Sequence, residues 1–333
     1  MSIKWSFSSE KCFRQCQRQY YFRNIAAWHN GREPVRREAF ILKQLKTREL
    51  WQGGLVHLGI ERFVIPNLET RVETNWNHVI ESTWKLALGQ FHFSEKRRYR
   101  EEGMSKTKAG DNYCALAIHE REEEISNDWL GAVREVIERC FKNLSEMDDL
   151  WQELANRGRY WAEVPLRLSY DRVHIEVRLD LLCFRAFGKP IIVDWKISES
   201  MGGYDARLQT ILYAWALCQT PAWQVANAED VDILEVPLLK GQIVRHKIKA
   251  EHFSELENRI YRGTDEIESL VEDKKFESIQ LEDFDFTENP NSCKYCFFQS
   301  LCRQNATPTP KPKSRSSRAR QLQPEPFFGG LLL

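Results

Sequence analysis

The sequence predicts an α/β protein in which helices flank a central mixed sheet and the N-terminal part is largely helical. Apolar residues recur at helical spacing amid dense charge in 34–65 and 111–145, and less clearly in 69–90. From Trp161 onward they fall instead in short, β-branched and partly alternating runs. With 42% apolar residues, including 18 Phe, 11 Trp and 10 Tyr, the 333-residue chain can build a large core.

The strand-forming half is expected to begin with an antiparallel meander. Its three segments are WAEVPLRLSY, VHIEVRLDLLCF and PIIVDWKIS, separated by YDR and AFGK. A helix over 205–218 follows, and then a hairpin of VDILEVPLL and QIVRHKIKA around Lys240 and Gly241. An amphipathic helix over 251–272 comes next. The expected order is therefore helices, three strands, helix, two strands, helix.

Charge and hydropathy limit the classes of partner. The 48 Lys and Arg residues balance the 48 Asp and Glu residues, so any nucleic acid or membrane must be met by a local patch. The longest uncharged stretch, 210–228, contains Gln219, Pro221 and Asn227, which favour a buried helix and a turn over a membrane span. Because the first residues lack the apolar segment of a secretory signal, we expect a cytoplasmic protein without membrane contact.

Composition divides the chain into two parts. Residues 1–305 are expected to form one domain, in which about 65–160 is a helical insertion. Residues 306–333 are rich in Pro, Ser and basic residues, a composition typical of a disordered tail.

The tail ends in an apolar peptide, FFGGLLL. Gln321, Phe327 and Phe328 have the spacing of a sliding-clamp peptide, although Pro324 replaces the usual aliphatic residue. Exposed aromatic side chains favour docking on a partner protein or on this same chain. An end without any partner is the alternative.

Charged residues on two neighbouring predicted strands indicate a metal-dependent hydrolytic site. Alternation places Asp194 and Lys196 on one face of a strand and Trp195 on the other. One face of the preceding strand carries His174, Glu176, Arg178 and Asp180. If these strands pair, Asp180 lies beside Asp194, and two carboxylates can bind magnesium or manganese. Lys196 could then orient a water molecule or stabilise charge on a phosphate.

An exposed Asp–Lys edge pair is the alternative interpretation of this motif. The apolar neighbours Ile191, Ile192, Val193 and Ile197 favour a buried strand instead.

Four other residues could contribute to the site. Glu163 could reach it from a neighbouring strand, on the face that carries Trp161, although a solvated face is equally consistent. His57 lies on a predicted apolar helix, where a histidine is often a core residue. Gln209 and Tyr213 are one helical turn apart just after the acidic strands, a spacing that alone is ordinary.

The cysteine spacing indicates a ligand cluster. Cys293, Cys296 and Cys302 form a C-x2-C-x5-C array, and the total of nine cysteines is odd, which disfavours a disulfide framework. A zinc site would usually recruit a second local ligand pair, which this chain lacks. An iron–sulfur cluster closed by a distant cysteine fits better. Cys12 and Cys16 are both candidates, and their spacing could place them on one side of a helix.

Taken in order, these motifs resemble the RecB-like branch of the PD-(D/E)XK nucleases. The resemblance spans roughly 6–303 and is strongest to the iron–sulfur group, which contains the AddB-type and CRISPR-associated RecB-like exonucleases. It implies a restriction-endonuclease-like core. It also implies that a [4Fe-4S] cluster is held by Cys16, Cys293, Cys296 and Cys302.

The same resemblance assigns roles at the acidic site. It implies that the catalytic metals are bound by His57, Asp180, Asp194 and the carbonyl of Trp195. Lys196 would be the catalytic lysine, and Gln209 with Tyr213 would form the Q-x-x-x-Y motif near DNA. The chain departs from the family pattern at Val177, at Gln17 and at Ile197–Ser198, where Gly, Pro and Thr-Gly are usual. These departures affect pocket shape and substrate preference more than the metal-binding positions.

We therefore expect a metal-dependent DNA nuclease acting on single strands or DNA ends, in a pathway such as repair or defence. Basic residues interleaved with aromatic ones could form the strand-binding surface: Arg14, Arg18, Arg23, Arg97, Arg98, Arg100, Tyr20, Tyr21, Phe22 and Tyr99. A solvated face is the alternative. Two rival functions are a catalytically idle nuclease fold that assists a partner enzyme, and a zinc-stabilised DNA-binding protein.

Overall fold

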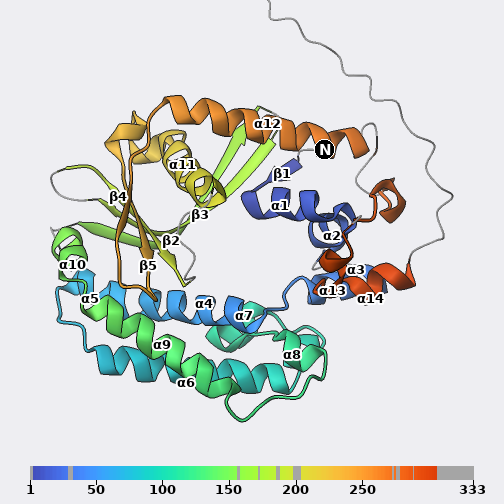
Figure 1. Cartoon of the computed structure of the whole chain (residues 1–333), viewed down its shortest axis with the longest axis horizontal. Coiled ribbons are helices and arrows are strands. Elements are labelled where there is room, and N and C mark those ends of the chain that lie inside the picture. Colours follow the sequence, from blue (N-terminus) through green and yellow to red (C-terminus); the bar gives the residue numbers. More distant parts are fainter. Residues whose placement is uncertain are drawn as a thin grey trace, which may run out of the picture.

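The computed structural model describes 3–28, 33–155, 158–171, 173–184, 188–197, 204–271, 274, 278–287 and 289–305. The expected tail, with Phe327 and Phe328, lies outside these residues. Within them, helices pack around a six-stranded sheet (Figure 1).

The N-terminal half is helical, as predicted. Its α-helices are α1 (Phe7–Gln15), α2 (Gln17–Tyr20), α3 (Pro34–Leu42), α4 (Arg48–Gly59), α5 (Ile65–Thr70), α6 (Trp76–Glu95), α7 (Lys106–Ala109), α8 (Ala117–Glu120), α9 (Trp129–Ser145) and α10 (Asp148–Leu154). Short π-helical turns follow α2 at Tyr21–Ala26 and α4 at Ile60–Val64.

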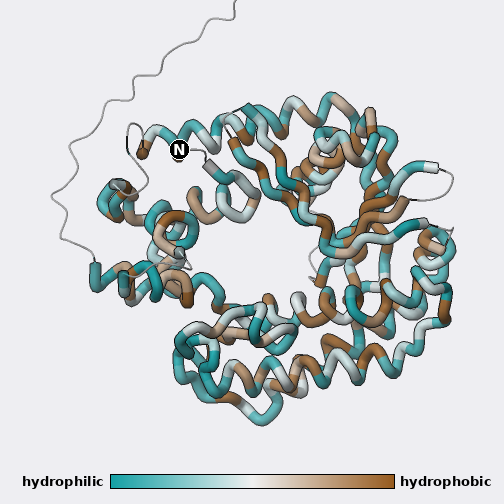
Figure 2. The backbone as a smooth tube through the Cα atoms, turned by 180° about the vertical axis from the view of Figure 1, so that it is seen from behind, coloured by the Kyte–Doolittle hydropathy of each residue, from teal (hydrophilic) through white to brown (hydrophobic). Residues whose placement is uncertain are grey.

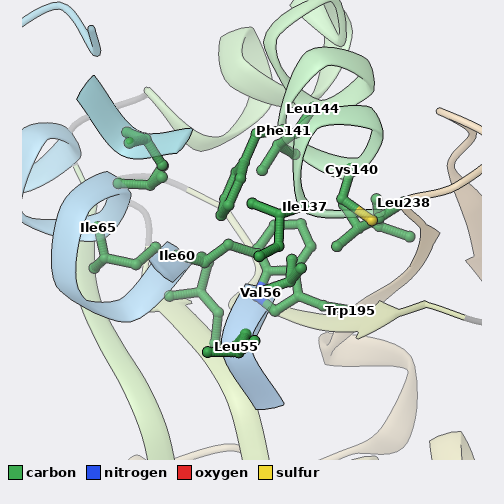
Figure 3. Close-up of a cluster of buried hydrophobic side chains, with 14 of the residues drawn as sticks. Leu55, Val56, Ile60, Ile65, Ile137, Cys140, Phe141, Leu144, Trp195 and Leu238 are labelled. Atoms are coloured by element: carbon green, nitrogen blue, oxygen red, sulfur yellow. The ribbon is translucent and has the colours of Figure 1, made fainter. Parts of the chain in front are cut away.

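Helix α4 anchors the helical part to the sheet. It begins at the N-cap Thr47, whose hydroxyl accepts a hydrogen bond from the Leu50 N–H. Its apolar face buries Leu55 and Val56 against α9 and against Trp195 of the sheet (Figure 3). His57, the next residue, is therefore held close to the strand that carries Trp195.

The sheet is mixed. Its strands are β1 (Ile3–Trp5), β2 (Arg159–Tyr170), β3 (Val173–Phe184), β4 (Ile191–Lys196), β5 (Asp232–Pro237) and β6 (Val244–His246). The predicted antiparallel meander is present as β2, β3 and β4, and the predicted hairpin as β5 and β6. Strands β4 and β5 are parallel, and β1, which was not predicted, runs parallel to β3.

Two different strands share one edge of β3. Strand β2 pairs with the other edge of β3 from Val173 to Phe184, with an interruption at Asp180 and Glu163. On the shared edge, β1 pairs with 173–175 and β4 pairs with 181–183. Among the described residues no strand pairs with 176–180 on that edge. The sheet is thus open beside Asp180.

Helices α11 (Tyr204–Cys218) and α12 (Glu251–Val271) cover one face of the sheet. Both were predicted, and α12 alternates hydrophilic and hydrophobic residues along its length (Figure 2). The uncharged stretch forms a buried helix from Thr210 to Leu217, followed by a turn at Pro221–Trp223. No helix in the described part of the chain is long and apolar enough to cross a membrane.

The two ends of the described chain pack together. Helices α13 (Pro290–Lys294) and α14 (Gln299–Gln304) lie beside α1 to α3 (Figure 1). Phe22 stacks on Phe298 with ring centroids 5.7 Å apart. The Arg18 Nε–H donates a hydrogen bond to the Phe284 carbonyl at 3.0 Å. These contacts belong to a hydrophobic core that joins the segments that carry the predicted cysteine ligands.

Candidate active site

The β3–β4 hairpin brings the two aspartates together. Leu181 pairs with Val193, so Asp180 and Asp194 occupy the next position of the same antiparallel ladder. The Trp195 N–H donates a hydrogen bond to Asp180 Oδ2 at 2.9 Å. The two carboxylates interact electrostatically at the opening of the sheet.

His57 reaches this site from α4. Its Nε2 lies 3.1 Å from the carbonyl oxygen of Trp195, and because a carbonyl can only accept, Nε2 carries the hydrogen. Nδ1 faces two carboxylates, at 3.6 Å from Asp180 Oδ1 and 3.8 Å from Glu163 Oε1. One potential ligand atom from each of His57, Glu163 and Asp180 lies within 4.8 Å of the others.

A backbone distortion brings Glu163 into this group. Its φ is 52°, in the left-handed region that side-chain-bearing residues rarely adopt. Tyr160 packs in the core shared with α4, whereas Val164, four residues later, packs in the core under α11. In a regular strand these two side chains would lie on the same face, so the distortion at Glu163 interrupts the alternation of β2. The expectation that Glu163 shares a face with Trp161 is wrong, because Trp161 packs on Phe184 and Trp223.

A second group of polar residues lies on the α11 side of β4. Lys196 Nζ is 2.7 Å from Asp194 Oδ2 and donates a hydrogen bond to Gln209 Oε1 at 3.1 Å. The Tyr213 hydroxyl donates to Asp194 Oδ1 at 3.0 Å. Gln209 and Tyr213 lie on one face of α11 and bond to each other. The ordinary helical spacing thus places both side chains against the Asp194–Lys196 pair.

Burial shapes the ionisation of the site. Burial raises the pKa of Asp180 to about 6, and the nearby Asp194 charge adds to this effect. Burial lowers the pKa of His57, but the interactions with Glu163 and with the charge of Asp180 outweigh it, so the net shift is upward. The interaction with His57 lowers the pKa of Glu163. Burial, reinforced by Asp194, holds the pKa of Tyr213 well above its usual value.

The donor set fits a divalent metal ion. Asp194 Oδ2 is buried and has no aligned hydrogen-bond donor, although the Lys196 charge lies beside it. An orphaned buried carboxylate oxygen of this kind is available as a ligand. Carboxylate oxygens suit magnesium and manganese, and the imidazole of His57 adds a nitrogen ligand.

The candidate cysteine ligands Cys16, Cys293, Cys296 and Cys302 lie near enough to one another to interact electrostatically. The charges of Cys16, Cys293 and Cys302 act on Cys296, and burial with these charges raises its pKa to about 11. Burial raises the pKa of Cys302, and the nearby Arg18 guanidinium partly offsets this effect. Among the described cysteines, no three thiol sulfurs lie within 4.8 Å of one another. The ligands of a single tetrahedral metal ion would lie closer together.

The expectation that Cys12 and Cys16 face one side of a single helix is wrong. Cys16 has an extended backbone, with φ of −164°, and ends α1 while it caps α2. Its sulfur accepts a hydrogen bond from the Gln19 N–H. Cys12 is buried in the apolar core, and burial raises its pKa to about 12.

The predicted strand-binding surface is also wrong. Its four aromatic residues are buried: Tyr20, Tyr21, Phe22 and Tyr99. Most of its arginines are engaged within the fold, as Arg100 is by Glu38 and Glu120. Arg23 alone among the six has no polar partner among the described residues. The sequence could not reveal contacts such as those of Arg100, because Glu38 and Glu120 lie in distant segments of the chain.

Comparison with protein families matches residues 4–303 to the PD-(D/E)XK nuclease superfamily. This chain belongs to that superfamily. The mixed sheet flanked by helices agrees with the restriction-endonuclease-like fold that the sequence predicts.

Solved structures resemble this nuclease only distantly. The crystal structure of SSO0001 has 17% identity and a TM-score of 0.28, covering 54% of this chain and 76% of its own. A predicted exonuclease from Eubacterium rectale has 11% identity and a TM-score of 0.33, covering 86% and 97%. Comparison with curated proteins gives no match.

Proposed function

We propose that the protein is a divalent-metal-dependent deoxyribonuclease that hydrolyses phosphodiester bonds. One observation carries the proposal: His57, Glu163 and Asp180 converge at the open edge of the sheet, and the Asp194–Lys196 pair lies on the neighbouring strand beside Asp180. A group of acids next to an aspartate–lysine pair has no evident structural need, whereas phosphodiester hydrolysis requires both kinds of group.

Each residue has a proposed role. His57 Nδ1 and the carboxylates of Glu163, Asp180 and Asp194 would hold magnesium or manganese, with the Trp195 carbonyl as a further ligand. The ion would polarise a phosphate oxygen and lower the pKa of a bound water molecule. Lys196, positioned by Asp194 and Gln209, stabilises negative charge that develops on the phosphate. Tyr213 orients Asp194 through its hydroxyl.

Single-stranded DNA or a DNA end is the proposed substrate. The side chain of Asp194 is 3% exposed and that of Asp180 is 14% exposed. A phosphate must therefore enter a recess to meet these carboxylates. A flexible single strand or frayed end can do so more readily than the interior of a duplex.

We also propose that Cys16, Cys293, Cys296 and Cys302 hold a structural [4Fe-4S] cluster. Their location where the two chain ends pack together supports this role, because a cluster there would cross-link α1 and α2 to α13 and α14. The hydrogen bond from the Gln19 N–H to the Cys16 sulfur and the positive charge of Arg18 near Cys302 suit thiolate ligands.

The decisive experiment uses end-labelled single- and double-stranded DNA with magnesium, manganese or EDTA. Wild-type protein should cut in the presence of either metal. Asp194→Asn and Lys196→Met should lower the rate by at least about 100-fold, since each removes a group that acts on the reacting phosphate. Asp128→Asn and Lys240→Met, at exposed positions, serve as matched controls.

Equal cutting by all five proteins would refute the assignment of these residues. No cutting of any DNA by wild-type protein with either metal would favour the idle-fold alternative.

A further inference from the structure

A cavity of about 390 Å³ lies at the gap in the sheet between β1 and β4. Its walls come from the first turns of α1, from residues 176–178 on the open edge of β3, from one face of α11, and from Arg259 of α12. Volumes of roughly 300 to 1,000 Å³ are typical of sites that bind small molecules. The cavity therefore has room for a group of the size of one nucleoside.

The gap exists because the chain turns away from β3 after β1. Ser6 is the N-cap of α1: its hydroxyl accepts a hydrogen bond from the Ser9 N–H, and its own N–H donates one to the Ser9 hydroxyl. This reciprocal cap ends the pairing of β1 at Trp5, and the chain continues as a helix. In the described part of the chain, residues 176–178 thus face the cavity on this edge instead of another strand.

The cavity adjoins both halves of the candidate active site. Gln209 and Tyr213 line it, and Gln209 Oε1 accepts a hydrogen bond from Lys196 at 3.1 Å. Arg178 lines it as well and contacts Glu163, a member of the candidate metal-binding group, at 3.4 Å. A phosphate between that group and Lys196 would therefore lie beside the cavity, with one of its attached nucleosides directed into it.

The lining of the cavity suits a base better than a phosphate alone. Val177 and Leu212 contribute buried apolar side chains, and Phe7 contributes a half-exposed aromatic ring. The Phe7 ring is held by Trp5, which packs edge-on with ring centroids 5.1 Å apart. The Arg259 guanidinium carbon lies 5.1 Å from the centroid of the Phe7 ring. An aromatic wall that is already fixed can stack on any base at little cost in conformational entropy.

Arg259 is fixed in turn by two acids. Its Nε–H donates a hydrogen bond to Glu10 Oε2 at 3.0 Å, and Nη1 donates one to Asp205 Oδ1 at 3.4 Å. Glu10 is fully buried in α1, and Asp205 lies in the first turn of α11. Contacts among α1, α11 and α12 therefore form this wall before any substrate binds.

We propose that this cavity receives the unpaired base of the nucleotide next to the phosphate that is cleaved, and we call it the base cavity. The proposal rests on the proposed function and adds to it the feature that selects the substrate. A base inside a duplex is paired and stacked, so it must be released from the duplex before it can enter. The base cavity thus favours single strands and frayed ends.

The test compares the binding of two fluorescent single strands of equal length in EDTA, where neither is cut. One strand carries thymine at every position, and in the other every nucleotide is a tetrahydrofuran abasic residue. Because both strands carry the same phosphates, the ratio of their Kd values reports the contribution of the bases. Wild-type protein should bind the thymine strand about 5- to 100-fold more tightly, the effect of stacking one base on an aromatic side chain.

Two variants alter the base cavity without changing its charge. Phe7→Leu removes the aromatic ring but keeps an apolar side chain, and Ala206→Met fills part of the cavity. Both should bring the ratio closer to one. The matched controls are Phe63→Leu, at a half-buried position, and Ala155→Met, at the exposed end of α10. Neither residue lines the cavity, so both controls should keep the wild-type ratio.

Circular dichroism shows whether each variant is folded, and either test variant suffices if the other does not fold. Equal binding of both strands by wild-type protein overturns the proposal, as does a wild-type ratio in every folded test variant. The proposed function fails separately: if the ratio changes as expected but manganese supports no cutting of DNA, the base cavity stands and the nuclease activity does not. Cutting of DNA with no preference for the thymine strand has the opposite meaning.

Discussion

His57 Nε2 lies 3.1 Å from the carbonyl oxygen of Trp195, a contact between residues 138 positions apart in the chain. The N–H of the same Trp195 holds Asp180. The main chain of Trp195 therefore orients one imidazole and one carboxylate, while its indole packs in the core with Val56. The proposed metal-binding atoms are thus positioned by the packing of α4 on the sheet, in the way that outer hydrogen bonds orient metal-binding histidines.

The first prediction concerns the affinity of the site for metal. His57→Ala should raise the manganese concentration needed for half-maximal DNA cleavage by about 10- to 100-fold, because the site loses its nitrogen ligand while three carboxylates remain. His92→Ala removes an exposed histidine of α6 and should leave the titration unchanged. Superimposable titrations of the His57→Ala and wild-type proteins would show that His57 is not a ligand.

The second prediction concerns pH and the stability of the metal-free protein. The pKa of Asp180 is about 6 in the fold against 3.8 ordinarily, so the folded state binds more protons between these values. Stability should therefore fall as pH rises from about 4 to 6. The Asp180→Asn variant has no ionisable group at this position. Its free energy of unfolding, relative to that of the wild type, should therefore rise by on the order of 2 kcal/mol between pH 4 and pH 6.

The measurement is the free energy of unfolding of both proteins in EDTA, at pH 4.5 and pH 7.5. The raised pKa of His57 acts in the same direction, since its contribution is lost as pH rises. Asp180→Asn also removes a charge that helps to raise the pKa of His57, which enlarges the expected difference between the two proteins. A constant difference between the two proteins at both pH values would contradict an ionising, buried Asp180.

The third prediction separates the two candidate cysteines. Replacement of Cys16, Cys293, Cys296 or Cys302 by Ser should abolish the visible absorption of anaerobically purified protein and lower its iron content and melting temperature. Cys12→Ser is the matched control, because Cys12 is a buried core residue four positions before Cys16. Loss of iron in Cys12→Ser with retention in Cys16→Ser would reverse the choice of ligand. Zinc in place of iron in the wild type would exclude the cluster.

The strand arrangement at the site could be predicted from sequence because alternation is a local property. The patterns around Asp180 and Asp194 predicted two paired strands, and β3 and β4 pair in the antiparallel sense. Glu163 could not be placed in the same way. Its positive φ breaks the alternation of β2, and tertiary contacts hold an unfavourable backbone conformation that no adjacent glycine signals.

Other features depend on partners that are distant in the chain. Strand β1 has three residues, too few for a recognisable period, and exists through its pairing with β3. The arginine-rich segments resembled a nucleic-acid surface because the sequence does not show that Arg100 meets Glu38.

The last prediction uses two glycines of α4 to test how tightly the helix beneath the site is packed. A Cβ on Gly59 would lie 2.4 Å from Thr83 Oγ1 and 2.7 Å from Phe141 Cζ, whereas a Cβ on Gly53 would meet nothing within 4 Å. Gly53→Ala should therefore stabilise the protein by roughly 0.5–1 kcal/mol through helix propensity. Gly59→Ala should destabilise it by roughly 1–3 kcal/mol, because α4 must move away from α6 and α9. Urea unfolding measures both changes. Since His57 is two residues from Gly59, the displacement of α4 in Gly59→Ala should also reduce metal-dependent cleavage. Equal stabilisation by Gly53→Ala and Gly59→Ala would show that α4 is free to shift.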